Sequence, residues 1–198
     1  MNIQENFSLK TFNTFGVEAK AKYFAEVHSL EELKETLQFS YSPILVLGGG
    51  SNVLFTKDFD GLVIKLNLKG ISEENLDENH VLVSAKAGEN WHEFVLYTLS
   101  KNYGGLENLS LIPGNVGTCP IQNIGAYGTE IKDHFVSCKA LNLKISEIEE
   151  LSLEDCKFGY RDSIFKTSAK RKYVIVEVTF KLTTQNHHIK TEYGAIST

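Results

Sequence analysis

The stretch AKYFAEVHSLEELKETLQFSYSPILVLGGGSN, residues 21–52, determines the fold of the N-terminal part of the chain. Residues 21–27 are rich in aromatic and β-branched side chains, which predicts a strand. Leucines at helical spacing follow Ser29, a residue type that caps helices, so we expect a helix over about 30–39. A proline ends that segment, and the short apolar run 44–48 is typical of a buried strand. Strand, helix and strand lead directly into the sequence GGGSN.

The GGGSN turn, residues 48–52, permits two interpretations. It holds the first two glycines of the pattern G-x-G-x-x-G, but Val53 stands in place of the third, and no Gly-Lys-Ser/Thr follows. Neither a Rossmann site nor a Walker A loop is therefore indicated. Three consecutive glycines allow positive φ, and successive amides can form an anion-binding concavity to which Ser51 and Asn52 add donors. The alternative is a tight turn without a ligand.

Strands and one further helix are predicted for the middle of the chain. Residues 62–68 and 81–88 have the composition of strands, and we expect the acidic connection 72–80 between them to be a solvated turn. Asn90 is placed to cap a second helix over 91–102, whose apolar face predicts packing against the core.

The C-terminal part is also expected to be rich in strands. Residues 134–143 and 172–182 have strand-like composition, and Ser152 is placed to cap a short helix between them. The β-α-β order gives way to a strand-rich part near 67–71, so we place a domain boundary there.

The segment LIPGNVGTCPIQNIGAYG, residues 111–128, is a second stretch rich in glycine, proline and amides. Its turn is followed by a glycine and a threonine that can present amides and a hydroxyl. Pro120 suits the first position of a short helix whose amino end would point at a phosphate. Side-chain amides here suit the edge of a heterocycle that carries carbonyls and ring nitrogens. The alternative is a well-packed loop crossing. The residues with these properties are Pro113, Gly114, Gly117, Thr118, Gln122 and Asn123.

The sequence FGYRDS, residues 158–163, places Arg161 between an aromatic residue and an acid. One interpretation is a surface ion pair that contributes little energy. The other is a guanidinium that Asp162 holds in place to bind a carboxylate at two points.

Charge and composition argue against several classes of partner. The 198 residues carry a formal net charge of -5, which disfavours a nucleic-acid or anionic-membrane partner. The apolar runs are too short to span a bilayer, and the N-terminus lacks the order of a signal peptide. Cys119, Cys138 and Cys156 are widely spaced, without a CxxC pair or a histidine cluster. We therefore expect reduced structural thiols, no metal site, no membrane insertion and a cytoplasmic location.

Six sequence blocks together resemble the UDP-N-acetylenolpyruvylglucosamine reductases of peptidoglycan synthesis. The resemblance runs from about residue 8 to the end of the chain, and two of the blocks are long and specific. The wider resemblance is to the vanillyl-alcohol-oxidase (PCMH) type of FAD-binding fold, an α+β fold of two subdomains with the flavin between them. The blocks are NTFG (13–16), LGGGSNVL (47–54), AGENWHEFV (87–95), GLENLSLIPGNVGTCPIQNIGAYG (105–128), FGYRDSIFK (158–166) and TEYGA (191–195).

The resemblance implies two FAD-binding subdomains, residues 1–68 and 69–198, and non-covalent FAD. NADPH would reduce the FAD, which would pass hydride to the enolpyruvyl group of UDP-GlcNAc-enolpyruvate and give UDP-N-acetylmuramate for the cell wall. Arg161 would stabilise negative charge on the substrate carboxylate, and Tyr160 and Tyr193 would contact the UDP-sugar. The residues implied for FAD are Gly48, Gly49, Gly50, Ser51, Asn52, Pro113, Gly114, Gly117, Thr118, Pro120, Gln122, Asn123 and Gly125.

Enzymes that this chain resembles continue into a third, substrate-binding domain with a proton-donating serine and an assisting glutamate. Neither has a counterpart in the 198 residues, so we expect this chain to bind FAD as a monomer and to be nearly inactive as a reductase. Two other functions stay open: another oxidoreductase of the same flavin superfamily, and a non-catalytic FAD-binding module. Whether the chain is a fragment or a natural short protein is open as well.

Overall fold

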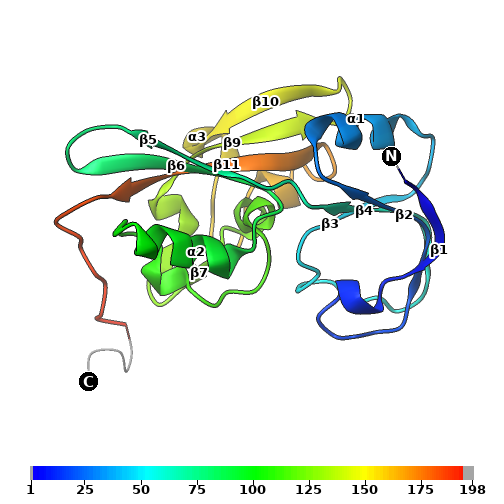
Figure 1. The fold of residues 1–198 in the computed structure, drawn as a ribbon, viewed down its shortest axis with the longest axis horizontal. Helices are drawn as coiled ribbons and strands as arrows, with labels where there is room; N and C mark the ends of the chain where they lie inside the picture. The colour runs from blue at the N-terminus through cyan, green and yellow to red at the C-terminus, as the bar shows by residue number, and fades with distance from the viewer. Residues whose placement is uncertain (1, 194–198) are drawn as a thin grey trace.

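Residues 2–193, which the computed structural model describes, form two main β-sheets that lie side by side (Figure 1). The first sheet is built from the N-terminal third of the chain and the second from the remainder. The chain passes from one to the other between Leu66 and Ile71. The mixture of helices and sheets confirms the α+β class. The division into subdomains between residues 68 and 69 stays a proposal.

The first sheet has the strand order β1-β2-β4-β3. Strands β2 and β3 both pair in parallel with β4, so the carboxyl ends of all three lie at one edge. The glycine-rich turn begins at this edge, directly after β3, and an open parallel sheet binds ligands at such an edge. The elements are β1 (Gln4–Ser8), β2 (Lys20–Val27), α1 (Leu30–Gln38), β3 (Ile44–Leu47) and β4 (Phe59–Leu66).

The second sheet has the order β10-β9-β11-β6-β5, and all of its pairings are antiparallel. Helix α2 covers one of its faces (Figure 1). Its strands are β5 (Ile71–Asn75), β6 (His80–Lys86), β9 (Phe135–Asn142), β10 (Glu147–Ser152) and β11 (Tyr173–Thr183). The other elements are α2 (Trp91–Ser100), the short pair β7 (Gly125–Ala126) and β8 (Thr129–Glu130), and α3 (Leu153–Cys156).

The structure confirms the helix starts that local sequence predicted. Ser29 Oγ accepts a hydrogen bond from the Glu32 N–H at 3.1 Å and caps α1. Asn90 Oδ1 accepts from the Glu93 N–H at 3.1 Å and caps α2. Ser152 caps the single turn of α3 in the same way. Each cap satisfies a backbone donor that the first turn leaves without an intrahelical partner.

Two predicted elements were wrong. The stretch 72–80 is not only a turn, because β5 pairs along β6 and the Glu73 carboxylate accepts hydrogen bonds from the hydroxyls of Tyr97 and Tyr103. The short helix does not begin at Pro120 either. A 3-10 helix spans Val116–Gln122, and its first turn closes where the Thr118 N–H meets the Asn115 carbonyl at 3.0 Å. Strand β10 was not predicted.

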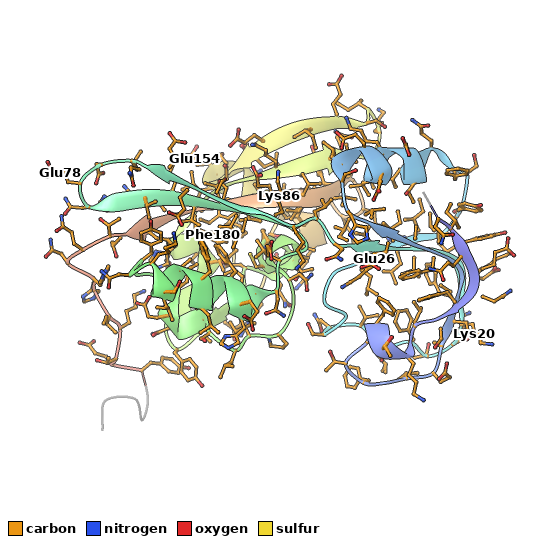
Figure 2. The ribbon with its side chains drawn as sticks, in the orientation of Figure 1. Lys20, Glu26, Glu78, Lys86, Glu154 and Phe180 are labelled. Atoms are coloured by element: carbon orange, nitrogen blue, oxygen red, sulfur yellow. The ribbon has the colours of Figure 1, made fainter. Side chains whose placement is uncertain are left out.

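The second sheet and α2 enclose the larger core. Trp91 and Phe94 of α2 lie with ring centroids 5.8 and 5.5 Å from Phe180 of β11, which Figure 2 shows between the sheet and α2. Leu66 and Leu68 belong to another buried cluster, together with Val174 of β11. This second cluster packs the two sheets against each other, so apolar burial fixes their relative position.

A buried carboxylate lies on the other face of the second sheet. Glu177 of β11 is only 10% exposed and pairs with Lys86 of β6 at 2.6 Å and Lys139 of β9 at 2.8 Å. Lys86 lies on the sheet face away from α2 (Figure 2). Burial alone would raise the pKa of Glu177, but the hydrogen bonds and charges of the two lysines outweigh burial and lower it.

Replacement of Glu177 tests this link between three strands. We expect Glu177→Gln to reduce the free energy of unfolding by about 1–2 kcal/mol at about pH 7, because two charge-assisted hydrogen bonds weaken. The lowered pKa stabilises the fold above the unfolded carboxyl pKa of about 4.3, and this contribution is lost as pH falls through the folded pKa. Urea unfolding at about pH 7 and about pH 3, with the exposed Glu154→Gln as control, measures the effect. A difference from wild type that does not shrink at the lower pH would contradict it.

Candidate functional site

A cavity of about 300 Å³ opens between the glycine-rich turn and the 3-10 helix Val116–Gln122. One wall is residues 46–53, where the parallel strands of the first sheet end. The facing wall is formed by Pro113, Asn115 and the 3-10 helix, and Trp91, Ile124 and Lys166 complete the lining.

The two walls approach so closely that the turn has no room for side chains. A Cβ on Gly48 would lie 2.5 Å from the Thr118 methyl. A Cβ on Gly49 would lie 2.8 Å from Asn115 Oδ1 and 2.9 Å from the Cα of Gly114. These distances are shorter than non-bonded carbon contacts allow, so glycine is required at both positions.

The turn presents unpaired donors to the cavity. Within residues 2–193, the backbone N–H groups of residues 49–52 donate no hydrogen bond, and neither do the side chains of Ser51 and Asn52. Gly50 has a φ of 69°, and a Cβ there would lie 2.0 Å from the carbonyl oxygen of Phe12, so the bend itself requires glycine. Successive free amides in such a turn attract an anion.

A lysine supports the turn from the sheet. Lys65 of β4 lies opposite Leu47 of β3 in the strand register, and its Nζ donates to the Gly48 carbonyl. Burial lowers the pKa of the Lys65 ammonium. The side chain places a positive charge beside the turn, which adds to the attraction of the free amides for an anion.

The facing wall is fixed to the end of the second sheet. The Gly117 N–H donates to the Ala87 carbonyl at 3.0 Å, and a Cβ on Gly117 would lie 2.5 Å from the Ala87 Cβ. Asn115 Nδ2 donates to the Gly88 carbonyl at 3.0 Å, and Thr118 Oγ1 donates to the Asn115 carbonyl at 2.7 Å. Gly117 thus allows close packing, while Asn115 holds the wall in place.

Eight of the thirteen residues implied as FAD contacts line the cavity. Of these, Gln122 has a side-chain amide that forms no hydrogen bond within residues 2–193. Contact between these residues and FAD stays a prediction. The eight are Gly48, Gly49, Gly50, Ser51, Asn52, Pro113, Thr118 and Gln122.

The other five implied residues lie off the cavity wall. Asn123 is fully buried, and its Nδ2 donates to the Gly159 carbonyl at 2.9 Å while its Oδ1 accepts from the Lys132 N–H at 3.2 Å. Both ends of its amide thus bond within the protein, and a contact between Asn123 and the edge of a heterocycle stays a prediction. The five residues are Gly114, which faces Gly49 at the rim, and Gly117, Pro120, Asn123 and Gly125.

Arg161 lies in a tight turn beside the cavity and does not line it. Gly159 and Asp162 exchange backbone hydrogen bonds at 3.0 and 3.3 Å, and Arg161 has a φ of 53°. Its guanidinium donates to the Gly125 carbonyl at 2.8 Å. Within residues 2–193 Arg161 forms no ion pair, so the surface ion pair and the guanidinium held by Asp162 were both wrong.

The two tyrosines implied for the substrate lie on the surface. Tyr160 is 87% exposed and Tyr193 is 58% exposed, and neither lines the cavity. The Tyr193 ring meets Tyr127 edge-on, with centroids 6.1 Å apart. Asn108 Nδ2 donates to the carbonyls of Tyr127 and Lys190, which holds the segment before Tyr193 against the loop 125–128. The last residues of the TEYGA block lie outside the described residues.

Sequence reasoning missed part of the lining. We assigned Trp91 to the core, where it is 1% exposed and its Nε1 donates to the Leu109 carbonyl at 2.7 Å, yet it also borders the cavity. Asn115 and Lys166 both lie inside the sequence blocks quoted above. Their place in these blocks was the one signal in the sequence that could have indicated a role in the site. The lining residues not predicted are Val46, Leu47, Val53, Trp91, Asn115, Cys119, Ile121, Ile124 and Lys166.

Other kinds of chemistry find little support here. Cys119 lines the cavity, but burial raises its pKa well above the ordinary range, which leaves a protonated and unreactive thiol. Cys138 and Cys156 are also buried, and neither forms a disulfide. In the described part of the chain, His, Cys, Asp and Glu form no group of three or more that is placed to hold a metal ion. Over the same residues, no helix has the length and apolar character required to cross a membrane.

The lining suits a ligand that combines an anion with a flat polar ring. The free amides and hydroxyl of the turn match an anion, and the Gln122 amide matches ring carbonyls and nitrogens. Trp91, Ile121 and Ile124 supply the apolar surface that a flat ring requires. FAD carries both parts, so the residues present fit this cofactor.

This chain is similar in sequence to a known protein family and to several curated proteins. Residues 21–152 match the family model of the FAD binding domain. The UDP-N-acetylenolpyruvoylglucosamine reductase of Flavobacterium johnsoniae is 57% identical over 197 residues, and that of Amoebophilus asiaticus is 50% identical over 199 residues. Each alignment covers 99% of this chain and 58% of the relative, so the chain spans little more than half the length of these curated relatives.

Two solved structures are similar to this chain in fold. The crystal structure of UDP-N-acetylenolpyruvylglucosamine reductase from Thermus caldophilus has a TM-score of 0.74 at 26% identity, and the match covers 97% of this chain and 65% of that one. A solvent-stable cholesterol oxidase, with a TM-score of 0.65 at 14% identity over 88% of this chain and 37% of its own, shows the fold alone. The fold is the predicted flavin-binding fold of the vanillyl-alcohol-oxidase type. The chain belongs to the FAD binding domain family.

Substitution of Gly49 tests whether the gap between the two walls is the cofactor site. We expect Gly49→Ala to weaken FAD binding by at least about tenfold, because the new methyl group must displace Asn115 or Gly114. Quenching of FAD fluorescence on titration with purified protein gives the dissociation constant. Gly16→Ala is the control: Gly16 has a φ of 62°, unlike Gly49, but a Cβ there meets no atom within 4 Å. That control should cost about 1 kcal/mol of stability and leave FAD affinity unchanged. Equal FAD affinities of the two variants would contradict the assignment.

Proposed function

We propose that this chain is the FAD-binding part of a reductase that acts on UDP-GlcNAc-enolpyruvate. NADPH would be the hydride donor, UDP-N-acetylmuramate the product, and the cytoplasm the site of this step in peptidoglycan synthesis. The observation that supports the proposal most directly is the turn of free amides that faces the 3-10 wall across the cavity. It occurs in a chain that is 57% identical to a protein named as that reductase.

The cavity residues would bind and orient the cofactor. FAD, when bound, supplies the hydride chemistry that no side chain can perform. The amides of residues 49–52 would hold its pyrophosphate, with the Lys65 charge beside them. Gln122 and the apolar side chains of the facing wall would hold the ring system and keep water from it.

Arg161 would act on the substrate rather than on the cofactor. A guanidinium has five N–H donors, and one of those of Arg161 bonds the Gly125 carbonyl. The remaining donors can bind the enolpyruvyl carboxylate and stabilise negative charge that develops there. Tyr160 precedes Arg161 in the chain, and the Tyr193 ring meets Tyr127, two residues after the Gly125 that Arg161 contacts. Both tyrosines are exposed, which supports a role for them in contacts with the UDP-sugar.

The chain spans 58% of the length of its relatives, so we propose that residues 1–198 on their own bind FAD as a monomer and turn over little substrate. The alternative is a non-catalytic flavin-binding module. Binding of the substrate by Arg161 would exclude that alternative.

Arg161→Met in the FAD-loaded chain tests the substrate half of the proposal. We expect FAD affinity to stay within about twofold of wild type, and the affinity for the enolpyruvyl UDP-sugar to fall by about 10- to 100-fold, as loss of a charge-assisted contact predicts. Substrate titration followed by the change in the flavin absorption spectrum measures both effects, with Arg171→Met as the control. Equal substrate responses of the two variants, or no response of wild type, would contradict the role of Arg161 in this chain.

A further inference from the structure

Lys166 is the one charged side chain on the cavity wall among the described residues. It is the last residue of a 3-10 helix, Ile164–Lys166, that follows the Arg161 turn directly. Ser163 caps that helix by accepting from the Phe165 N–H at 3.2 Å. The backbone therefore fixes where the Lys166 side chain begins, on the same short segment that carries Arg161.

The Lys166 side chain reaches back to the Arg161 turn. Its Nζ donates to the Arg161 carbonyl at 2.7 Å. Arg161 has a left-handed backbone with φ of 53°, a conformation that side-chain-bearing residues adopt rarely, so the turn needs contacts that hold it. The ammonium supplies one of these contacts at Arg161 itself.

Further contacts of the turn are made with the 3-10 helix of the cavity wall and the residues just after it. Asn123 Nδ2 donates to the Gly159 carbonyl at 2.9 Å, and Ser163 Oγ donates to the Ile121 carbonyl at 2.7 Å. Ile121 itself lines the cavity. Hydrogen bonds at Gly159 and at Ser163 thus hold the turn on both sides of Arg161. Among the residues that contact the turn, Lys166 is the one whose charged side chain lines the cavity.

An ammonium in this position has bonding capacity left for a ligand. Lysine has three N–H donors, and one of them is used by the Arg161 carbonyl. Within residues 2–193, no carboxylate forms an ion pair with Lys166. A cation without a carboxylate partner on a cavity wall favours an anionic ligand, and FAD is anionic.

We propose that Lys166 is a positioning residue that couples occupation of the cavity by FAD to the geometry of the Arg161 turn. The inference rests on the proposed function and extends it. Its ammonium bonds the anionic cofactor with one donor and the Arg161 carbonyl with another, so cofactor binding tightens the turn that presents the guanidinium. By linkage the coupling is reciprocal: loss of the contact with the turn also weakens FAD binding.

The experiment compares wild type with Lys166→Met, Lys166→Arg and Lys170→Met. Lys170 is an exposed lysine four residues further on that does not line the cavity, so its variant controls for loss of one positive charge. FAD dissociation constants are measured by fluorescence quenching at about 50 and about 500 mM salt, which separates screened from unscreened charge effects. Hydrogen–deuterium exchange of the peptide over 158–163 is measured with and without saturating FAD.

We expect Lys166→Met to weaken FAD binding about 5- to 10-fold at low salt and less at high salt, as loss of one charge-assisted contact predicts. In wild type, FAD should slow exchange over 158–163 by about threefold or more, and in Lys166→Met saturating FAD should leave that exchange unchanged. Lys166→Arg keeps the charge and should stay within about threefold of wild type in FAD affinity. Lys170→Met should match wild type in both measurements.

Several outcomes would overturn the inference. Wild-type FAD affinity in Lys166→Met, or FAD-induced protection of the turn in that variant equal to wild type, would show that Lys166 does not couple the two sites. Equal weakening in Lys166→Met and Lys170→Met would show a general charge effect. If wild type binds FAD but the variants give one of these contradicting results, the role of Lys166 is wrong and the proposed function is unaffected. A wild-type chain that takes up no FAD would contradict the proposed function itself.

Discussion

One close contact governs this structure: the glycine-rich turn after β3 lies against the segment that precedes and begins the 3-10 helix. Gly48 and Gly49 meet Thr118 and Asn115 at distances that exclude a Cβ. The turn belongs to the first sheet and the 3-10 helix is packed on the end of the second, so this contact sets the spacing between the two halves of the site. Glycine is used here for close approach as well as for backbone freedom.

The same wall carries the proposed cofactor site and the proposed catalytic arginine. On its inner side it lines the cavity, and on its outer side Asn123 and the Ile121 carbonyl hold the turn that contains Arg161. The Gly125 carbonyl, just beyond the 3-10 helix, fixes the guanidinium. The proposed function thus depends on a segment with little regular structure, which hydrogen bonds to its neighbours and the burial of Trp91 hold in place.

Local sequence signals predicted local structure well. The caps at Ser29 and Asn90, the strands around the first helix and the amide-rich turn at 48–52 each depend on a few adjacent residues. Contacts over long distances in sequence could not be predicted in this way. Asn123 was assigned to the cofactor, but it supports Gly159, 36 residues later, and Arg161 is held by Gly125 rather than by its neighbour Asp162. Strand β5 was hidden because its acidic side chains suit a solvated turn as well as an edge strand.

The most direct test of the central claim is a crystal structure of this chain with bound FAD. We predict that the pyrophosphate oxygens accept hydrogen bonds from the backbone amides of residues 49–52, and that the ring system lies against the wall formed by the 3-10 helix. FAD bound with its phosphates away from this turn, or with the turn's amides still unpaired, would contradict the assignment of the cavity between the two glycine-rich segments as the cofactor site.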